Sequence, residues 1–362
     1  MNSNHKVNVV RIDEIHSHPN ADTLGLVYIG GYQVVVKKDN YKVGDLAVYI
    51  QPDSIVPSTE PFKFLWADKE FVGEVPEKYR RITVRRFRKE WSEGLLLPLS
   101  DFVSVIGFGP KPHGWEEGDD LASEIGITHY VEPDPTYVLG TPGRKLTLWQ
   151  KILKFFGLAP KPFGPKNSPG AYDVESLKNY PRLFQEGEEV IATEKIHGSN
   201  ARYMFDGKTF WVGSHHRWWK DKRNIWWRVA EKYPWIEAFC REWPRATLFG
   251  EVTPTQGGYQ YGNTPEERFF AFDIKRPDGT WVDKKVLYKF PGIQQLAPIV
   301  YQGPYDAKKI KELTEGPSIV EGAKHIREGL VVTSAVERQV RGVGRAQLKI
   351  KSMKFFEKES GK

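Results

Sequence analysis

The stretch from residue 193 to residue 200 reads Thr193-Glu194-Lys195-Ile196-His197-Gly198-Ser199-Asn200. It places a lysine just after a largely apolar run, residues 189–193, that predicts a buried strand. A turn is expected at the glycine. A lysine at a strand end, partly removed from water, can lose its proton and act as a nucleophile. Glycine lets the backbone approach a bound ligand closely. The stretch therefore indicates a nucleophilic lysine beside a binding site.

Composition narrows the class of protein. The chain has 362 residues, a length typical of two domains, and a formal net charge of +7 with a pI near 9.1. This basic balance favours a polyanionic partner such as nucleic acid. The single cysteine, Cys240, excludes an intramolecular disulfide and a cysteine-based zinc site. No long uncharged apolar run occurs, so we expect a cytoplasmic monomer that does not enter a membrane.

The N-terminal part predicts a small β-barrel. Short strands are expected where β-branched and aromatic residues lie between turn signals such as Gly30-Gly31 and Pro52-Asp53. Several short strands without helical spacing favour an OB-like module for nucleic-acid binding, and we assign residues 1–130 to it. The expected strands are Val7–Ile12, Leu24–Ile29, Tyr32–Val36, Leu46–Ile50, Ile82–Phe87 and Gly94–Pro98.

The rest of the chain divides into a connecting segment and a second domain. Residues 131–170 end in a stretch dense in proline and glycine and predict a linker, with a short helix over Leu146–Phe156. Residues 171–362 mix strands with helices expected over Asn224–Lys232 and Trp235–Trp243. The fold class predicted for the whole chain is α+β.

Segments downstream of Lys195 carry groups suited to phosphate chemistry. Two carboxylates, Glu251 and Glu328, each stand at the boundary of an apolar strand. Lys349 and Lys351 lie two residues apart on an expected strand, so both point to one face and can reach phosphate oxygens. Each feature alone has an ordinary structural explanation, whereas their joint occurrence in this order favours a catalytic site. The segments are Leu248–Val252, Arg268–Ile274, Glu328–Val332 and Gln347–Ser352.

In this order, the segments resemble the motifs of the covalent nucleotidyltransferases. The pattern K-x-H-G-x-N that begins at Lys195 resembles that of their RNA ligase branch. The barrel before the second domain and the short tail after Ser352 are similar to the Deinococcus-type RNA ligases. The resemblance implies a nucleotidyltransferase domain of ATP-grasp-like antiparallel sheets with helices in residues 171–362.

The resemblance implies a role for each motif residue. Glu194 contacts the adenine amino group, Phe272 stacks on the adenine ring, and Arg217 holds the ribose. The implied catalytic set is Lys195, Glu251, Glu328, Lys349 and Lys351, and the implied metal set is Asn200, Glu251 and Glu328. The implied nucleotide-binding set is Glu194, Lys195, Ile196, His197, Asn200, Arg217, Glu251, Phe272, Lys349 and Lys351.

The resemblance also implies the chemistry. Lys195 attacks the α-phosphorus of ATP with Mg²⁺ or Mn²⁺ present, and AMP then passes to a 5′-phosphate, which a 3′-hydroxyl attacks. Because a free lysine has a pKa of about 10.4, we expect burial and neighbouring cations to lower the pKa of Lys195. The expected partner is a nicked duplex that contains RNA at the 3′-hydroxyl side.

A basic segment of the N-terminal module is the candidate nucleic-acid contact. It alternates cations with aromatic and apolar residues over 79–89, which suits contacts to phosphates, although an exposed edge strand explains it equally well. Twelve tryptophans could also stack on bases, but we expect most of them in the core. The candidate residues are Arg80, Arg81, Arg85, Arg86 and Arg88.

Two alternatives remain. One is a DNA ligase or a capping-type nucleotidyltransferase, which His197 and Asn200 disfavour because those families usually carry other residues there. The other is a non-catalytic nucleic-acid-binding protein with a decayed domain. The retained Lys195 and Glu328 disfavour it, and formation of a covalent adduct with labelled ATP would exclude it.

Overall fold

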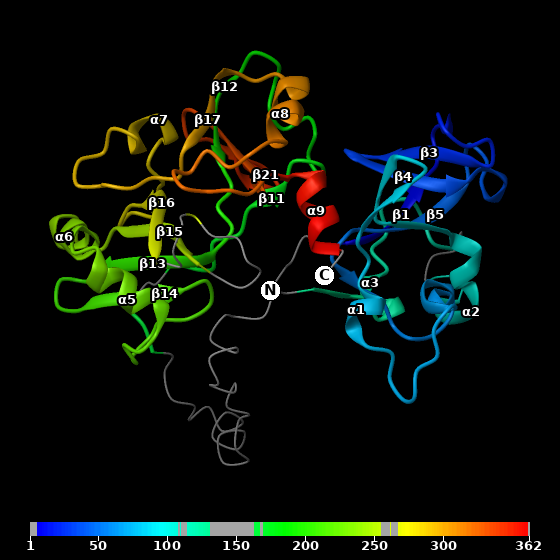
Figure 1. Ribbon diagram of the computed structural model, residues 1–362, viewed down its shortest axis with the longest axis horizontal. Helices are drawn as coiled ribbons and strands as arrows, with labels where there is room; N and C mark the ends of the chain where they lie inside the picture. Colours follow the sequence, from blue (N-terminus) through cyan, green and yellow to red (C-terminus); the bar gives the residue numbers. More distant parts are fainter. Residues whose placement is uncertain are drawn as a thin grey trace. The chain divides into compact units, whose positions relative to one another are not determined.

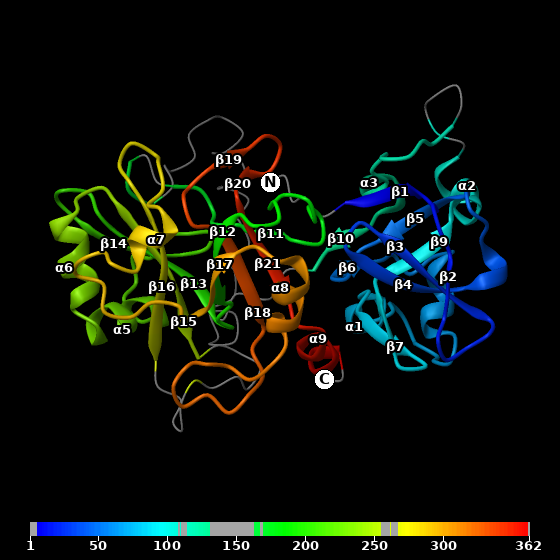
Figure 2. The same ribbon diagram turned by 90° about the horizontal axis from the view of Figure 1, so that it is seen from above.

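The computed structural model describes residues 6–107, 109, 114–130, 163–166, 169–254, 261 and 267–360 (Figures 1 and 2). The chain forms two compact units, each assembled from separate parts of the sequence. Unit 1 comprises Met1–Glu132, Leu177–Pro181 and Met353–Lys362, and unit 2 comprises Pro133–Ser176 and Arg182–Ser352. Most of the predicted linker and the helix expected over Leu146–Phe156 lie outside the described residues.

Unit 1 is built from small antiparallel sheets. The first has the order β1-β5-β9 and the second the order β2-β3-β4, and two further pairs are β7-β8 and β10-β6. Their bounds are β1 Val7–Arg11, β2 His16–Ser17, β3 Leu24–Ile29, β4 Tyr32–Lys37, β5 Leu46–Ile50, β6 Ser54–Ile55, β7 Val84–Phe87, β8 Glu90–Glu93, β9 Leu95–Pro98 and β10 Thr128–His129.

Strand β5 carries the core of unit 1 on both of its faces. Ala47 and Tyr49 pack into one apolar cluster, and Val48 and Ile50 pack into another. This alternation follows from the two-residue period of a strand. Short helical turns close the module, and their bounds are η1 Lys38–Asn40, η2 Phe62–Trp66, α1 Glu77–Arg80, η3 Leu99–Phe102, α2 Val103–Ile106 and α3 Ala122–Ile125.

Strand β8 was missed in the sequence because it is rich in polar residues, with Trp91 as the exception. Arg88 and Lys89 both have positive φ, +46° and +79°, and form the tight connection between β7 and β8. The Ser92 hydroxyl accepts a hydrogen bond from the Val35 N–H at 3.0 Å. The strand predicted over Ile82–Phe87 begins at Val84.

Two segments from late in the sequence complete unit 1. The Lys178 ammonium pairs with the buried Glu93 carboxylate, and the Tyr32 hydroxyl donates to Asn179 Oδ1 at 2.9 Å. Helix α9, Met353–Ser360, packs on β7 with Phe355 buried. No sequence pattern marks these two late segments as part of unit 1. The sequence therefore predicted two domains, each formed by one continuous stretch of chain.

Unit 2 contains two main sheets, which Figures 1 and 2 show side by side. The five-stranded sheet has the order β11-β21-β18-β12-β17, and its pairs are antiparallel except β11 with β21. The four-stranded sheet has the order β14-β13-β15-β16 and is antiparallel. The bounds are β11 Glu175–Ser176, β12 Glu189–Glu194, β13 Ser199–Phe205, β14 Phe210–Ser214, β15 Thr247–Thr253, β16 Arg268–Lys275, β17 Ile299–Pro304, β18 Gly329–Ser334, β19 Gln339–Val340, β20 Gly344–Arg345 and β21 Gln347–Lys351.

Helices cover one face of the four-stranded sheet. Helices α5, Ile225–Lys232, and α6, Trp235–Glu242, bury Trp226 and Phe239 against Phe269 of β16. Asn224 caps α5 by accepting the Trp227 N–H at 3.1 Å, and both helices lie where the sequence predicted them. The remaining helices are α7 Lys284–Leu287 and α8 Ala307–Thr314. Within the described ranges, no helix has the length and apolar character needed to cross a bilayer.

Candidate active site

Lys195 leaves the five-stranded sheet directly after the buried strand β12. The strand lies between β18 and β17, and Val190, Ile191 and Ala192 are at most 1% exposed. The backbone N–H of Lys195 donates to Gly329 O at 3.0 Å, which fixes the start of its side chain. The side chain is 24% exposed, so its ammonium group can meet a ligand.

Glu328 is the counter-ion of Lys195. Its Oε1 lies 2.7 Å from Lys195 Nζ and 3.9 Å from Lys351 Nζ, and its Oε2 lies 3.3 Å from His197 Nδ1. Burial alone would raise the pKa of this carboxyl group, but Lys195, His197 and Lys351 outweigh burial and hold the pKa well below its ordinary value. Glu328 is therefore ionised at neutral pH and orients three side chains.

Strand β21 presents its two lysines beside this carboxylate. Lys349 and Lys351 are half-buried. Leu348, before them, and Ile350, between them, are buried, as the predicted alternation requires. Burial, followed by repulsion from Lys351 and Lys195, lowers the pKa of Lys349 to about 8. Lysines grouped this closely suit a ligand with several negative charges.

The four-stranded sheet supplies neutral and carboxylate oxygens. Asn200 of β13 lies directly opposite Glu251 of β15 in the sheet register. Among the described residues, the buried Asn200 Oδ1 has no hydrogen-bond partner. An orphaned buried acceptor is costly unless a ligand or ion satisfies it, so this atom is expected to meet one.

Gly198, at the connection of the two sheets, has a different role from the one expected. A Cβ atom there would lie 2.5 Å from Val252 O and 2.7 Å from Glu251 Cγ. The missing side chain therefore makes room for β15 and its glutamate, whereas the sequence suggested room for a ligand.

The residues of both sheets meet at a cavity of about 200 Å³. It brings together seven of the predicted site residues, Glu194, Lys195, Ile196, Asn200, Glu251, Phe272 and Lys349. His197, Glu328 and Lys351 do not line the cavity but surround the Lys195 ammonium or its partner.

Phe272 lines the cavity together with Tyr172 and Lys284, two residues that sequence reasoning missed. The Tyr172 ring lies 4.9 Å from the Phe272 ring. The buried Lys284 donates to Phe272 O at 2.6 Å, and burial lowers the pKa of its ammonium group to about 8. Phe272 packs against a small apolar cluster that contains Phe270 and Ile196. Lys284 adjoins Asp283 and Lys285, so in the sequence it resembles a surface lysine.

Glu194 is held by hydrogen bonds from residues 318 and 319. Its carboxylate accepts a hydrogen bond from the Ser318 hydroxyl at 2.5 Å and from the Ile319 N–H at 2.8 Å. The His197 N–H donates to the Tyr261 hydroxyl at 2.8 Å. These contacts fix the backbone on either side of Lys195, and the adenine contact implied for Glu194 stays a prediction.

Arg217 does not line the cavity. Its guanidinium lies 4.1 Å from the centre of the Trp219 ring, and the side chain is exposed. His215 lines the cavity in its place, with Nε2 3.2 Å from Asp173 Oδ1. The doubled histidine after β14 shifts the arginine along the chain, so the ribose contact implied for it has no support in this geometry.

The predicted metal residues do not form a ready-made metal cage. Among the described residues, no group of three or more histidine, cysteine, aspartate and glutamate side chains could hold a metal ion. Mg²⁺ usually takes one or two carboxylates and completes its shell with water and substrate phosphates. Glu251 with the orphaned Asn200 Oδ1 fits such an open arrangement, whereas Glu328 already pairs with Lys195.

The arginines of unit 1 fall into two groups. Arg80 donates to Val75 O and Val56 O, and Arg81 pairs with Asp53 at 2.5 Å, so both hold the module together. Arg80 ends α1 and was wrongly expected to lie on a strand. Arg85, Arg86 and Arg88 are exposed on β7 and its turn, with Arg86 stacked on the Trp91 ring at 4.2 Å.

Comparison with known proteins agrees with the two units. Residues 6–99 match the family model of an OB-fold domain, and residues 188–351 match the RNA ligase family model. A search of curated protein sequences gave no significant match.

Solved structures of one RNA ligase share this fold over nearly its full length. The Naegleria gruberi RNA ligase with pyrophosphate is 21% identical, with 99% of each chain covered and a TM-score of 0.74. A mutant of that ligase with ATP and Mn is 21% identical, with 97% of this chain and 98% of that chain covered and a TM-score of 0.73. A further mutant with AMP and Mn is 20% identical, with 98% of each chain covered and a TM-score of 0.72.

These findings confirm the predicted fold class, an N-terminal OB-fold domain followed by an α+β ligase domain. The chain carries an RNA ligase domain, and its enzyme class is RNA ligase.

Proposed function

We propose that this chain is an ATP-dependent RNA ligase that seals 3′-hydroxyl/5′-phosphate nicks in duplexes through a covalent lysyl-AMP. The observation that carries the proposal is the placement of Lys195. It lines the active-site cavity together with Lys349, and the Glu328 carboxylate lies 2.7 Å from its ammonium nitrogen. A lysine fixed among phosphate-binding cations is suited to attack a phosphate.

ATP fits the groups that line the cavity. Lys195 and Lys349 offer positive charge to the phosphates, the Phe272 ring offers an apolar face to adenine, and Asn200 Oδ1 lacks a partner that a ligand or ion would supply. The matching Naegleria gruberi ligase mutants contain ATP and Mn or AMP and Mn. A divalent ion held by Glu251 and Asn200 would offset charge on the phosphates.

In the first step, Lys195 Nζ forms a bond to the α-phosphorus of ATP, and the bond from that phosphorus to the bridging oxygen breaks. Pyrophosphate leaves and lysyl-AMP remains. The lysine must first lose its proton, which the ion pair with Glu328 opposes and the nearby cations Lys349 and Lys351 favour. Positioning of Lys195 by Glu328 and charge stabilisation by the lysine pair are the contributions of the protein.

In the second step, a 5′-phosphate oxygen attacks the phosphorus of lysyl-AMP and releases Lys195. In the third step, a 3′-hydroxyl attacks the activated 5′-phosphate, the new phosphodiester forms, and AMP leaves. We propose that the 3′-hydroxyl belongs to a ribonucleotide and that the reaction serves RNA repair by a monomeric enzyme. Arg85, Arg86 and Arg88, exposed on unit 1, are the proposed contacts to the duplex backbone.

Covalent labelling tests the first step. The full chain is incubated with α-³²P-labelled ATP and Mg²⁺ or Mn²⁺, and protein-bound label is measured after denaturation. Label is expected on the wild type and on Lys289→Ala, a control at an exposed lysine of unit 2. Lys195→Ala should carry none. Absence of label on the wild type, or equal label on Lys195→Ala, would refute the mechanism.

A nick panel tests the substrate. Duplexes that carry a 5′-phosphate are compared with a ribonucleotide or a deoxyribonucleotide at the 3′-hydroxyl end. Faster sealing with the ribonucleotide supports the assignment. Equal sealing of both would instead indicate a ligase without RNA preference at that position.

A further inference from the structure

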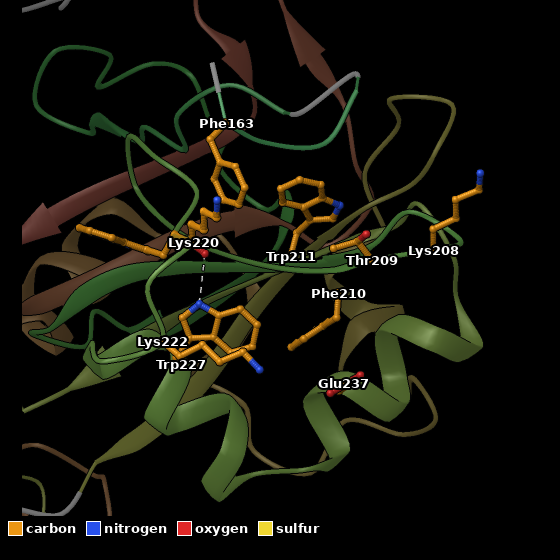
Figure 3. A pocket seen from close by; sticks show the side chains of 10 residues that line it. Phe163, Lys208, Thr209, Phe210, Trp211, Lys220, Lys222, Trp227 and Glu237 are labelled. Atoms are coloured by element: carbon orange, nitrogen blue, oxygen red, sulfur yellow. Dashed lines mark hydrogen bonds between the residues drawn. The ribbon is translucent and has the colours of Figure 1, made fainter. Parts of the chain in front are cut away.

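A second cavity lies on unit 2 and shares no lining residue with the active-site cavity. Its volume is about 410 Å³, and it surrounds the start of β14, the edge strand of the four-stranded sheet (Figure 3). We call it the aromatic pocket, because five of its lining residues have aromatic rings, Phe163, Phe210, Trp211, Trp219 and Trp227.

The rings stand in two groups, one on each side of β14. Phe210 and Trp211 are consecutive on the strand and therefore point to opposite faces. The Phe163 ring lies 5.1 Å from the Trp211 ring, and the Phe210 ring lies 5.9 Å from the Trp227 ring. Figure 3 shows the first pair above the strand and the second below it.

These rings are only partly buried in the hydrophobic core. Trp226 and Trp235 are buried, whereas Trp211 and Trp227 are half-buried and Phe163 is 46% exposed. In the described part of the chain, the indole Nε1 of Trp219 is buried and has no hydrogen-bond partner. A half-exposed group of rings with an unsatisfied donor is suited to an aromatic ligand that carries acceptors.

The charge of the aromatic pocket is positive. Three exposed lysines line it, Lys208, Lys220 and Lys222, and the Lys222 ammonium lies 4.6 Å from the Trp227 ring. Glu237 is the carboxylate among the lining residues, and Arg241 already neutralises it at 2.6 Å. Cations beside stacked rings are the combination with which proteins hold single-stranded nucleic acid.

The same loop reaches both cavities. His215, one residue after β14, lines the active-site cavity, and Trp219 lines the aromatic pocket. Four residues of extended chain span at most roughly 14 Å, so the Cα atoms of these residues are no farther apart than that. One short loop of unit 2 therefore borders both cavities.

We propose that the aromatic pocket binds an unpaired nucleotide of the RNA strand being joined, with its base against Trp211 and its phosphates near Lys220 and Lys222. The inference rests on the proposed function, which makes RNA the substrate. A paired base hides both of its faces in the helical stack, so a pocket walled by rings favours an unpaired one. The enzyme would then hold frayed or single-stranded RNA beside the join.

Binding of a labelled oligonucleotide tests the proposal. Fluorescence anisotropy of a short fluorescein-labelled single-stranded RNA is measured with the full chain and with Trp211→Leu. We expect affinity to fall by about tenfold, the usual effect of losing one stacking ring. The matched control is Trp243→Leu, an exposed tryptophan of unit 2 outside the pocket, which should bind like the wild type.

A lysine pair provides a second, milder variant. Lys220→Gln with Lys222→Gln should flatten the dependence of log affinity on log salt by about 0.7 for each phosphate that the variant no longer neutralises. The control Lys308→Gln removes an exposed lysine from α8 and should leave the slope unchanged. The lysine variants decide the question if Trp211→Leu fails to fold.

Unchanged affinity and salt slope in folded variants would overturn the proposal. An equal loss of affinity for fully paired and single-stranded RNA would overturn the preference for an unpaired nucleotide. Labelling of Lys195 separates this inference from the proposed function. Pocket variants should form lysyl-AMP at the wild-type rate, and Lys195→Ala should still bind the oligonucleotide.

Discussion

The two sheets of unit 2 contribute different chemistry to one cavity. The five-stranded sheet brings three lysines near Glu328, whose carboxylate lies 2.7 Å from the Lys195 ammonium and 3.9 Å from that of Lys351. The four-stranded sheet supplies Phe272 and Asn200, whose Oδ1 has no partner among the described residues. The excess positive charge on one side suits a triphosphate, and the unsatisfied polar and aromatic groups on the other suit a nucleoside.

The largest effect is expected on the charged side. Glu328→Gln keeps the shape of the side chain but removes the charge that holds Lys195 and His197. We expect lysyl-AMP formation to slow by roughly 10²-fold, as is usual when one preorganised electrostatic group is removed. Single-turnover labelling with α-³²P-labelled ATP measures the rate. A wild-type rate would mean that the lysine pair positions Lys195 without the carboxylate.

A smaller effect is expected on the nucleoside side. Phe272→Ala removes the ring that faces the cavity, and the KM for ATP should rise about tenfold, the equivalent of about 1.4 kcal/mol for one aromatic ring stacked on the base. Pyrophosphate release measures KM and kcat. Phe272→Tyr is the matched control and should restore most of the affinity. If kcat fell while KM stayed the same, Phe272 would contribute to the reaction at the phosphates and not to nucleoside binding. That result would contradict the assignment of different roles to the two sheets.

The smallest effect is a change of pH dependence. The pKa of Lys349 is about 8, so this side chain loses its positive charge as the pH rises through 8, and ATP should bind several-fold more weakly at pH 9 than at pH 7. Lys349→Arg keeps its charge throughout this range and should flatten the KM profile. A wild-type profile that is already flat would contradict the prediction.

Titration of Lys349 does not destabilise the fold at high pH, so unfolding through this group would not explain weaker ATP binding at pH 9. The folded-state pKa of Lys349 lies below that of a free lysine, so the unfolded chain binds this proton more tightly. The contribution of Lys349 to the free energy of unfolding therefore increases as the pH rises from about 8 to about 10.4. Thermal melts at pH 7 and pH 9 provide the check.

Local patterns predicted much of this molecule. Strands such as β3 and β5 were expected with the bounds that the structure has, because β-branched runs between turn residues report directly on local conformation. The lysines of β21 were predicted to share a face for the same reason, since strand alternation depends on two residues only. The motifs identified Lys195, Glu251 and Glu328 as residues of one site. Their catalytic roles stay predictions.

The remainder depends on contacts between distant parts of the chain. Nothing in the sequence pairs Lys284 with the carbonyl of Phe272, or Ser318 with Glu194, because each pair is brought together only by the folded sheets. The sequence predicts a phosphate contact for Arg81, and the structure pairs this side chain with Asp53. The sequence alone does not distinguish a basic residue that contacts a phosphate from one that pairs with a carboxylate of the same protein.

The late segments of unit 1 set an order for its assembly on the ribosome. Glu93 is buried beside Lys178, and β7 is covered by α9, which is synthesised after all of unit 2. A nascent chain that ends before Leu177 therefore has an unpaired carboxylate in a closing barrel and an uncovered β7. The N-terminal module becomes complete only after the ligase domain, so a truncated translation product would lack a finished N-terminal module.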